Sequence, residues 1–204
     1  MNIYSITTYR KLLPYDNYLH KRYIHIGYNY SIKGPSFVWY RLYRNSILKP
    51  SIKKRIDFYP EPNIHYKHRS YNSNYYNSGY DRGHLAPDSS FDDTYDKLHT
   101  VYTLANVIPQ RASFNRKGWL AAERYSKLIA LKYKYCYVLN IVLYINNNTI
   151  LNDVGIPDIY YKIIINNKQK FIKIFRFMMF DNSTTIKDNV VSPEYCINEL
   201  KKYK

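Results

Sequence analysis

Five short segments rich in β-branched and aromatic residues limit the folds that this chain can adopt. Clusters of Asn, Pro, Gly or Lys separate them, as is typical of strands joined by turns. The segments are residues 23–32, 36–44, 134–145, 158–167 and 171–180. Such a series of short strands predicts a sheet that is mainly antiparallel.

One segment, residues 114–135, predicts a long helix instead. At about 100° per residue, four apolar side chains fall within one sector of that helix, which indicates a face packed on the core. They are Leu120, Leu128, Leu131 and Tyr135. No internal repeat and no linker divides the chain. We therefore predict an α+β fold in a single domain, residues 1–204.

The chain is strongly basic, with 31 Lys and Arg against 15 Asp and Glu residues and a formal net charge of +16. The positive charge is spread along the sequence and is not confined to a tail. Such a charge attracts polyanions. An anionic membrane surface would satisfy it too, but no basic amphipathic helix is present to lie on one. We expect DNA or RNA as the partner, and no membrane.

The cysteines and the apolar runs bear on the cellular compartment. Cys136 and Cys196 lie far apart with no CxxC pair, so we expect free thiols and no cysteine-type zinc site. No segment reaches the ~18 apolar residues of a transmembrane helix, and residues 1–23 contain no apolar run typical of a secretory signal. We expect an intracellular, cytoplasmic protein, in the host-cell cytoplasm if the chain is viral.

The segment SGYDRGHLAPDSSF, residues 78–91, contains the residues best suited to chemistry. The neutral imidazole of His84, with an ordinary pKa of about 6.5, can take a proton from water. Arg82 can hold phosphate oxygens in a fork, which a Lys does less specifically. Gly79 would form a turn, and Gly83 would let His84 and Arg82 approach a phosphate closely.

A second polar group lies on the predicted helix. Asn115, Trp119 and Glu123 are four residues apart, so they line one stripe beside the apolar face. The amide oxygen of Asn115 is a neutral hard ligand, and a site with one protein oxygen leaves most of the shell to water, as Mg²⁺ prefers. Glu123 could hold those waters. With His84 as base, the two segments predict metal-assisted hydrolysis of a phosphodiester.

In these motifs the chain resembles the DNA/RNA non-specific endonucleases of the ββα-metal fold. The shared pattern is DRGH…AP at 81–87, N-x-x-PQ at 106–110 and N-x-x-x-W-x-x-x-E at 115–123. The resemblance is strongest over residues 28–180, with 1–22 and 182–204 peripheral. It implies a ββα-metal nuclease fold in which the long helix carries the metal ligand.

The resemblance also implies a role for each matching residue. His84 would be the general base and Asn115 the direct Mg²⁺ ligand, with Mn²⁺ as an alternative ion. Glu123 would hold metal-bound water, and Arg82 would contact the phosphate. The other expected site residues are Asn106 and Gln110 for catalysis, Lys127 and Arg111 for substrate binding, and Asp81, Gly83 and Trp119 as structural supports.

The activity implied is metal-dependent, largely sequence-non-specific cleavage of DNA, RNA or both to 5′-phosphorylated fragments. Low specificity follows because contacts to phosphate carry no sequence information. Lys127 stands where many relatives have Arg, and it keeps the charge but not the fork. The alternative is a catalytically inactive nucleic-acid-binding protein that retains the fold. The oligomeric state is left open, with a homodimer as one option.

The remaining polar clusters are interpreted as surface features. His65 and His68 lack a third ligand at a suitable spacing. The acidic run after the DRGH motif lacks the Gly and the closing Glu of an EF-hand loop. We interpret that run as a polar connection; it comprises Asp88, Asp92, Asp93 and Asp96.

Overall fold

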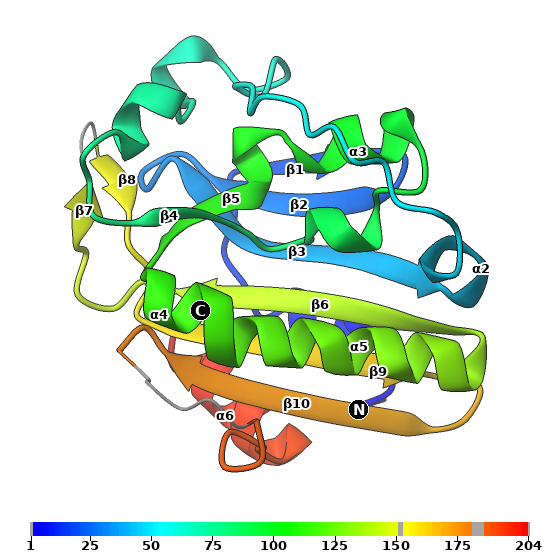
Figure 1. Ribbon diagram of the computed structural model, residues 1–204. Helices are drawn as coiled ribbons and strands as arrows, with labels where there is room; N and C mark the ends of the chain where they lie inside the picture. The colour runs from blue at the N-terminus through cyan, green and yellow to red at the C-terminus, as the bar shows by residue number, and fades with distance from the viewer. Residues whose placement is uncertain (1, 151–152, 181–185, 204) are drawn as a thin grey trace.

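A six-stranded antiparallel sheet forms the centre of the computed structural model, which describes residues 2–150, 153–180 and 186–203 (Figure 1). The strand order is β1-β2-β3-β6-β9-β10. The strands are β1 Asn17–His20, β2 Ile24–Asn29, β3 Gly34–Tyr43, β6 Tyr135–Leu143, β9 Ile159–Asn166 and β10 Phe171–Met178. The five predicted segments correspond to β2, β3, β6, β9 and β10, so the predicted α+β class with a mainly antiparallel sheet is confirmed. The sequence pattern does not reveal β1, which has only four residues.

Two short antiparallel ribbons lie outside this sheet. Strands β4 (Asp81–His84) and β5 (Val107–Gln110) form one, so the DRGH motif is itself a strand. Strands β7 (Thr149–Ile150) and β8 (Val154–Gly155) form the other.

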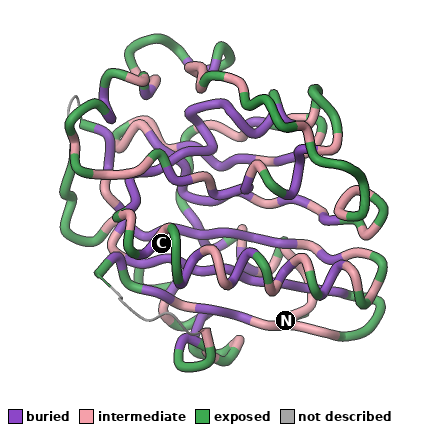
Figure 2. The backbone as a smooth tube through the Cα atoms, viewed as in Figure 1, coloured by how far each residue is buried: buried purple, intermediate pink, exposed green. Residues whose placement is uncertain are grey.

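Helices cover both faces of the large sheet. Their bounds are α1 Ile6–Arg10, α2 Arg44–Ile47, α3 Tyr95–Val101, α4 Ala112–Phe114, α5 Leu120–Tyr133 and α6 Pro193–Lys202. Helix α5 lies across one face, along β6 and β9 (Figure 1). On the other face, side chains of the α1 region and α6, such as Tyr9 and Leu200, form a second core cluster with Phe37 and Leu139 of the sheet. Figure 2 shows the central strands buried along most of their length.

The predicted helix is confirmed with shifted ends. Helix α4, a π-helical turn over Asn115–Trp119 and α5 follow one another directly. The helical segment ends at Lys134, whose φ of 71° is left-handed, and Tyr135 already belongs to β6. A single π-helical turn inside a helix is often found at a functional site.

The predicted apolar face of this helix is wrong. Leu128 is 60% exposed, whereas Trp119 and Glu123 lie on the buried face. That face is otherwise lined by small or branched residues: Ala122, Ser126, Ile129 and Ala130. Large apolar side chains alone do not identify this buried face, because small side chains also allow a helix to pack closely on a sheet.

Among the residues that the structure describes, no helix is long and apolar enough to cross a membrane.

Candidate active site

The DRGH motif is positioned by its pairing with β5, which places Asp81 opposite Gln110. A φ of 78° at Gly79 turns the chain just before β4, as only glycine does at little cost. Gly83 lies directly against the side chain of Gln110. A Cβ on Gly83 would lie 2.0 Å from Oε1 of Gln110, so this position leaves room for that side chain.

The imidazole of His84 lies between aromatic rings. Its centroid is 4.9 Å from that of Phe58 and 5.1 Å from that of Tyr102. Its Nε2 is buried and has no hydrogen-bond partner among the described residues. Burial lowers the pKa of His84 to about 4; the Asp88 carboxylate opposes this effect and nearby guanidinium groups add to it. The imidazole is therefore neutral at pH 7, the form that accepts a proton.

Asn115 is oriented by the first residue of the DRGH motif. Its Nδ2 donates to Oδ2 of Asp81 at 3.0 Å. The same carboxylate holds the Arg116 guanidinium, with 2.9 Å between Nη2 and Oδ1. Because the amide nitrogen is engaged, Oδ1 of Asn115 is the atom available to a cation.

Glu123 is an almost buried carboxylate, 8% exposed. Burial raises its pKa, and the charges of Lys162 and Lys127 oppose that rise. Lys162, on β9, is fully buried and donates to Oδ1 of Asn140 at 2.7 Å. Its Nζ lies 3.9 Å from the ring centroid of Trp119. A buried acid and a buried ammonium group thus share the interior around Trp119.

Trp119 also joins the helix to the DRGH strand. Its side chain is fully buried, and its Nε1 donates to the backbone oxygen of His84 at 3.3 Å. This bond connects the segment that carries Asn115 and Glu123 to the segment that carries the base.

One cavity of about 320 Å³ brings four of the expected site residues together: Arg82, His84, Asn115 and Glu123. The rest of its lining is Pro87, Asp88, Ser89, Arg116 and Leu120. The Arg82 guanidinium lies 4.8 Å from the ring centroid of Phe58, and its Nη1 donates to Oδ1 of Asn72 at 2.9 Å. The candidate base, phosphate contact and metal ligands therefore share one opening.

Asn106 and Gln110 do not line this cavity. Asn106 is fully buried, and its side chain bonds the backbone of Ala86 in both directions, at 2.9 and 3.0 Å, and the oxygen of Val101 at 2.8 Å. It therefore fixes the chain directly after His84. Gln110 is also fully buried, and neither of its amide atoms has a partner among the described residues.

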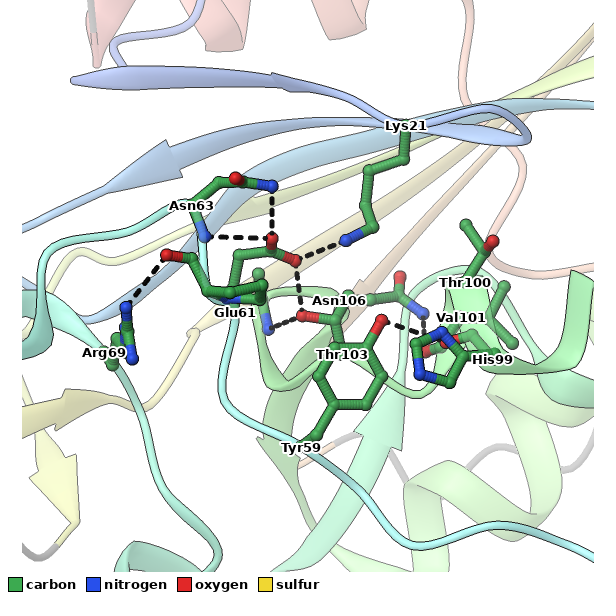
Figure 3. A network of polar contacts seen from close by, with 12 residues as sticks. Lys21, Tyr59, Glu61, Asn63, Arg69, His99, Thr100, Val101, Thr103 and Asn106 are labelled. Carbon is green, nitrogen blue, oxygen red and sulfur yellow. Dashed lines mark hydrogen bonds and ion pairs between the residues drawn. The ribbon is translucent and has the colours of Figure 1, made fainter. Parts of the chain in front are cut away.

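A buried carboxylate network anchors the turn that carries Asn106 (Figure 3). Glu61, 2% exposed, accepts from Nζ of Lys21 at 2.6 Å and from Oγ1 of Thr103 at 2.8 Å. Thr103 in turn caps the short helical turn that ends at Asn106. The network connects the turn between β1 and β2 to the turn of Asn106, which fixes the chain directly after His84.

Lys127 and Arg111 also lie outside the lining. Nζ of Lys127 donates to the backbone oxygen and to Oγ of Ser89, so it fastens one wall of the cavity. Arg111 is exposed and stacks on Phe180, with 4.9 Å from its guanidinium carbon to the ring centroid.

The structure adds residues that the sequence pattern did not single out. Asp88 lines the cavity and accepts from Nε of Arg55 at 2.9 Å and from the Tyr102 hydroxyl at 3.1 Å. Asp88 lies in the predicted polar connection between β4 and α3, and it also lines the cavity, which the sequence did not indicate. Lys162 was detectable in principle, because a single cation inside an apolar strand needs a buried partner.

The donors around the cavity fit a divalent cation held largely by water. Oδ1 of Asn115 and the carboxylates of Glu123 and Asp88 are all hard oxygen donors, the type that Mg²⁺ and Mn²⁺ prefer. In the described parts of the chain, no three His, Cys, Asp or Glu side chains form a group that could hold a metal. A cation bound at Asn115 would thus keep most of its shell as water.

Comparison with known proteins places this geometry in a family. The sequence model of the DNA/RNA non-specific endonucleases matches residues 6–200. Human Endonuclease G, mitochondrial, is 29% identical over 125 residues, covering 55% of this chain and 42% of the relative. The mitochondrial nuclease of Saccharomyces cerevisiae is 26% identical over 154 residues, covering 68% and 47%. The chain thus spans less than half the length of these curated relatives.

A solved structure shows the same fold. A chain in the crystal structure of the EndoG/EndoGI complex superimposes with a TM-score of 0.83, at 24% identity, covering 92% of this chain and 84% of that one. The ββα-metal nuclease fold expected from the motifs is thereby confirmed. With the family match over nearly the whole chain, the conclusion is that this protein belongs to the DNA/RNA non-specific endonuclease family.

Proposed function

We propose that this protein is a Mg²⁺-dependent endonuclease that hydrolyses phosphodiester bonds of DNA, RNA or both with little sequence preference. One observation carries the proposal: the neutral base His84, the available amide oxygen of Asn115 and the carboxylate of Glu123 line the same cavity. The name of the family supports the reaction class.

In this mechanism His84 is the general base. Its neutral imidazole takes a proton from a water molecule, which attacks the phosphorus in line with the leaving 3′ oxygen. As the new P–O bond forms, the bond to the 3′ oxygen breaks, and a water held by Glu123 supplies the proton that this oxygen needs. Arg82 holds a non-bridging oxygen of the phosphate. The products are a 5′-phosphate and a 3′-hydroxyl.

A divalent cation at Oδ1 of Asn115 would stabilise negative charge on the phosphate and on the leaving oxygen. Asn115 would be its direct ligand, and Glu123 would hold its waters. We propose Mg²⁺, and Mn²⁺ suits the same oxygen donors.

The other residues support this centre. Asp81 orients Asn115, while Asn106 and Trp119 hold the chain around His84. Gln110 packs against Gly83. Lys127 and Arg111 lie outside the cavity, so we assign them to phosphates farther along the substrate.

Metal dependence gives the direct test of the function. Supercoiled plasmid and a structured RNA are incubated with the protein in Mg²⁺, Mn²⁺ or EDTA, with Asn115→Ala as the matched variant. We expect nicking and degradation with either cation only, ligatable 5′-phosphate ends, and activity reduced by about 10- to 100-fold or more in the variant. Cleavage in EDTA would refute the mechanism. Binding without cleavage would instead establish the alternative, an inactive nucleic-acid-binding protein.

We further propose that residues 1–204 form one nuclease unit that acts inside the cell. The curated relatives Endonuclease G and Nuclease EXOG are named mitochondrial. Imaging of the tagged protein distinguishes a cytoplasmic from a mitochondrial location, and sedimentation velocity gives the oligomeric state.

A further inference from the structure

A second cavity, of about 330 Å³, lies next to the active site across the segment 87–91. Ser89 lines the active-site cavity, whereas Ser90 and Phe91 line the second one. The cavity adjoins the C-terminal end of β3. There β3 continues to Tyr43, past its last residue pair with β2, which is Tyr40 with Ile24. The volume of the cavity falls in the range of roughly 300–1,000 Å³ found for ligand sites.

Half-buried aromatic rings form much of its wall. Trp39 and Tyr137 line this cavity and also an adjoining one of about 310 Å³. The indole of Trp39 stacks on His25, with 3.9 Å between centroids and 12° between planes. His25 covers one face of Trp39, and the rings of Trp39 and Tyr137 border both hollows.

The lining is cationic. Arg22, Arg41 and Lys97 line the larger cavity and Arg10 lines the other, and the described residues that line the two include no Asp or Glu. Arg22 and Lys97 have carboxylate partners outside the wall, at 3.0 and 2.7 Å.

Arg41 is the exception in this set. Its guanidinium carbon lies 4.7, 4.1 and 5.2 Å from the ring centroids of Tyr43, Tyr135 and Tyr137. Its Nε is buried and, within the described residues, has no hydrogen-bond partner. A guanidinium flanked by aromatic rings, and without an ion pair among the described residues, is suited to an anion that also carries a flat ring.

We propose that this cavity is a second nucleic-acid site that binds an unpaired stretch of DNA or RNA. A base stacks on Trp39 and Tyr137, and Arg41 binds a neighbouring phosphate. Stacking requires bases that are not already paired and stacked in a duplex, so a single strand suits the site better than a duplex does. Trp39 and Tyr137 pack against the core cluster of α1 and α6, on the sheet face opposite α5, so this site is separate from the cleavage cavity and does not rest on the proposed function.

The test is binding without cleavage, in a His84→Ala background with EDTA. Fluorescence anisotropy compares an oligothymidylate of about 12 nucleotides with a duplex of the same length. We expect Arg41→Gln and Tyr137→Leu each to weaken binding of the single strand by about tenfold and binding of the duplex by less than about twofold. Lys201→Gln and Tyr195→Leu, both at exposed positions of α6, are the matched controls and should change neither affinity.

A second measurement needs only one conservative aromatic substitution. The chain has 2 tryptophans, and Trp119 is fully buried, so oligothymidylate should quench the fluorescence of Trp39 alone. Trp39→Phe should abolish that quenching and keep the fold.

Unchanged single-strand affinity in Arg41→Gln and Tyr137→Leu, equal losses for strand and duplex, or no quenching would each overturn the proposal. The proposal would also be overturned if sedimentation showed that these substitutions dissociate a dimer while oligonucleotide affinity stays normal. In that case a second copy of the chain would occupy the cavity. Cleavage of plasmid by the unmodified protein is measured separately, so failure of this site and failure of the nuclease activity are distinguishable.

Discussion

Asp81 accepts a hydrogen bond from the side-chain amide of Asn115 across 3.0 Å, and this contact leaves Oδ1 of Asn115 as the atom available to the proposed cation. Two motifs that are separate in the sequence thus form one unit. The strand supplies the orienting carboxylate, and the π-helical turn supplies the proposed metal ligand.

Removal of this orienting contact should weaken metal use more than it weakens folding. In Asp81→Ala, the Asn115 amide can rotate, so we expect activity at limiting Mg²⁺ to fall by about 10- to 100-fold and partial recovery at high Mg²⁺. The measurement is a Mg²⁺ titration of the initial cleavage rate. Arg116→Gln keeps the Asp81–Asn115 bond and should have a much smaller effect. Wild-type metal dependence in Asp81→Ala would contradict the assignment.

Glu123, and not His84, should set the acid limit of activity. Burial raises the pKa of Glu123 and lowers that of His84 to about 4, so Glu123 gains a proton first as the pH falls below neutral. A protonated Glu123 holds a cation poorly, and the proton and the cation compete. The profile of kcat/KM should therefore have an acid limb that moves to lower pH as Mg²⁺ is raised. An acid limb whose pH does not change with Mg²⁺ concentration, or that is still present in Glu123→Gln, would contradict the assignment of this limb to Glu123.

The buried residue Lys162 should influence the pH at which this acid limb occurs. Its ammonium charge lowers the pKa of Glu123, so Lys162→Met should move the acid limb to higher pH. The variant also leaves Oδ1 of Asn140 without its donor, which should cost about 1–3 kcal/mol of folding free energy. A pH profile at a temperature where the variant is folded separates the two effects. An unshifted limb would show that Lys162 serves stability only.

Gly83→Ala should be destabilising because of Gln110 and not because of the substrate. The added Cβ would lie 2.0 Å from Oε1 and 2.4 Å from Cδ of Gln110, and we expect a loss of about 1–3 kcal/mol. Shortening Gln110 should relieve the overlap. The double variant Gly83→Ala/Gln110→Ala should therefore lose less unfolding free energy than the sum of the losses in the two single variants. A double-mutant cycle by urea denaturation measures this coupling. Additive losses would mean that Gly83 is needed for another reason.

The Glu61 network should contribute stability that depends on pH. Burial alone would raise the pKa of Glu61, but bonds from Lys21 and Thr103 hold it below its usual range. This stabilisation is present above the pKa of the unfolded carboxyl, about 4.3, and is lost as the pH falls through the lower folded value. Glu61→Gln should cost about 2–4 kcal/mol at pH 7, and the difference from wild type should shrink in acid. Lys49→Gln, which loses only a 3.9 Å contact of a side chain 57% exposed, should cost less than about 0.5 kcal/mol. A difference that is constant with pH would contradict the role of the Glu61 charge.

The strands and the site motifs were predictable because their signals are local. β-Branched runs mark β9 and β10, and the spacing of Asn115 and Glu123 predicts that both lie on one side of the helical segment, which in the structure lines the cavity. The buried face of α5 was not predictable from large apolar residues, since Ala122 and Ser126 form it.

Other features of the site depend on contacts between distant segments. The fit of Gly83 against Gln110 follows from the β4–β5 register. Asp88 and Lys162 join the site only through tertiary packing. No local pattern of sequence encodes such neighbours.

Chemical rescue distinguishes a general base at His84 from a structural role of this residue. His84→Gly removes an imidazole that lies between Phe58 and Tyr102, and leaves an aromatic slot that free imidazole can enter. We predict that Mg²⁺-dependent cleavage falls by about 10²- to 10⁴-fold, that nucleic-acid binding is unchanged, and that added imidazole restores a substantial part of the rate. His84→Gln, which fills the slot without a base, should stay inactive with imidazole. Cleavage by His84→Gly at the wild-type rate without imidazole would contradict the assignment of His84 as the general base.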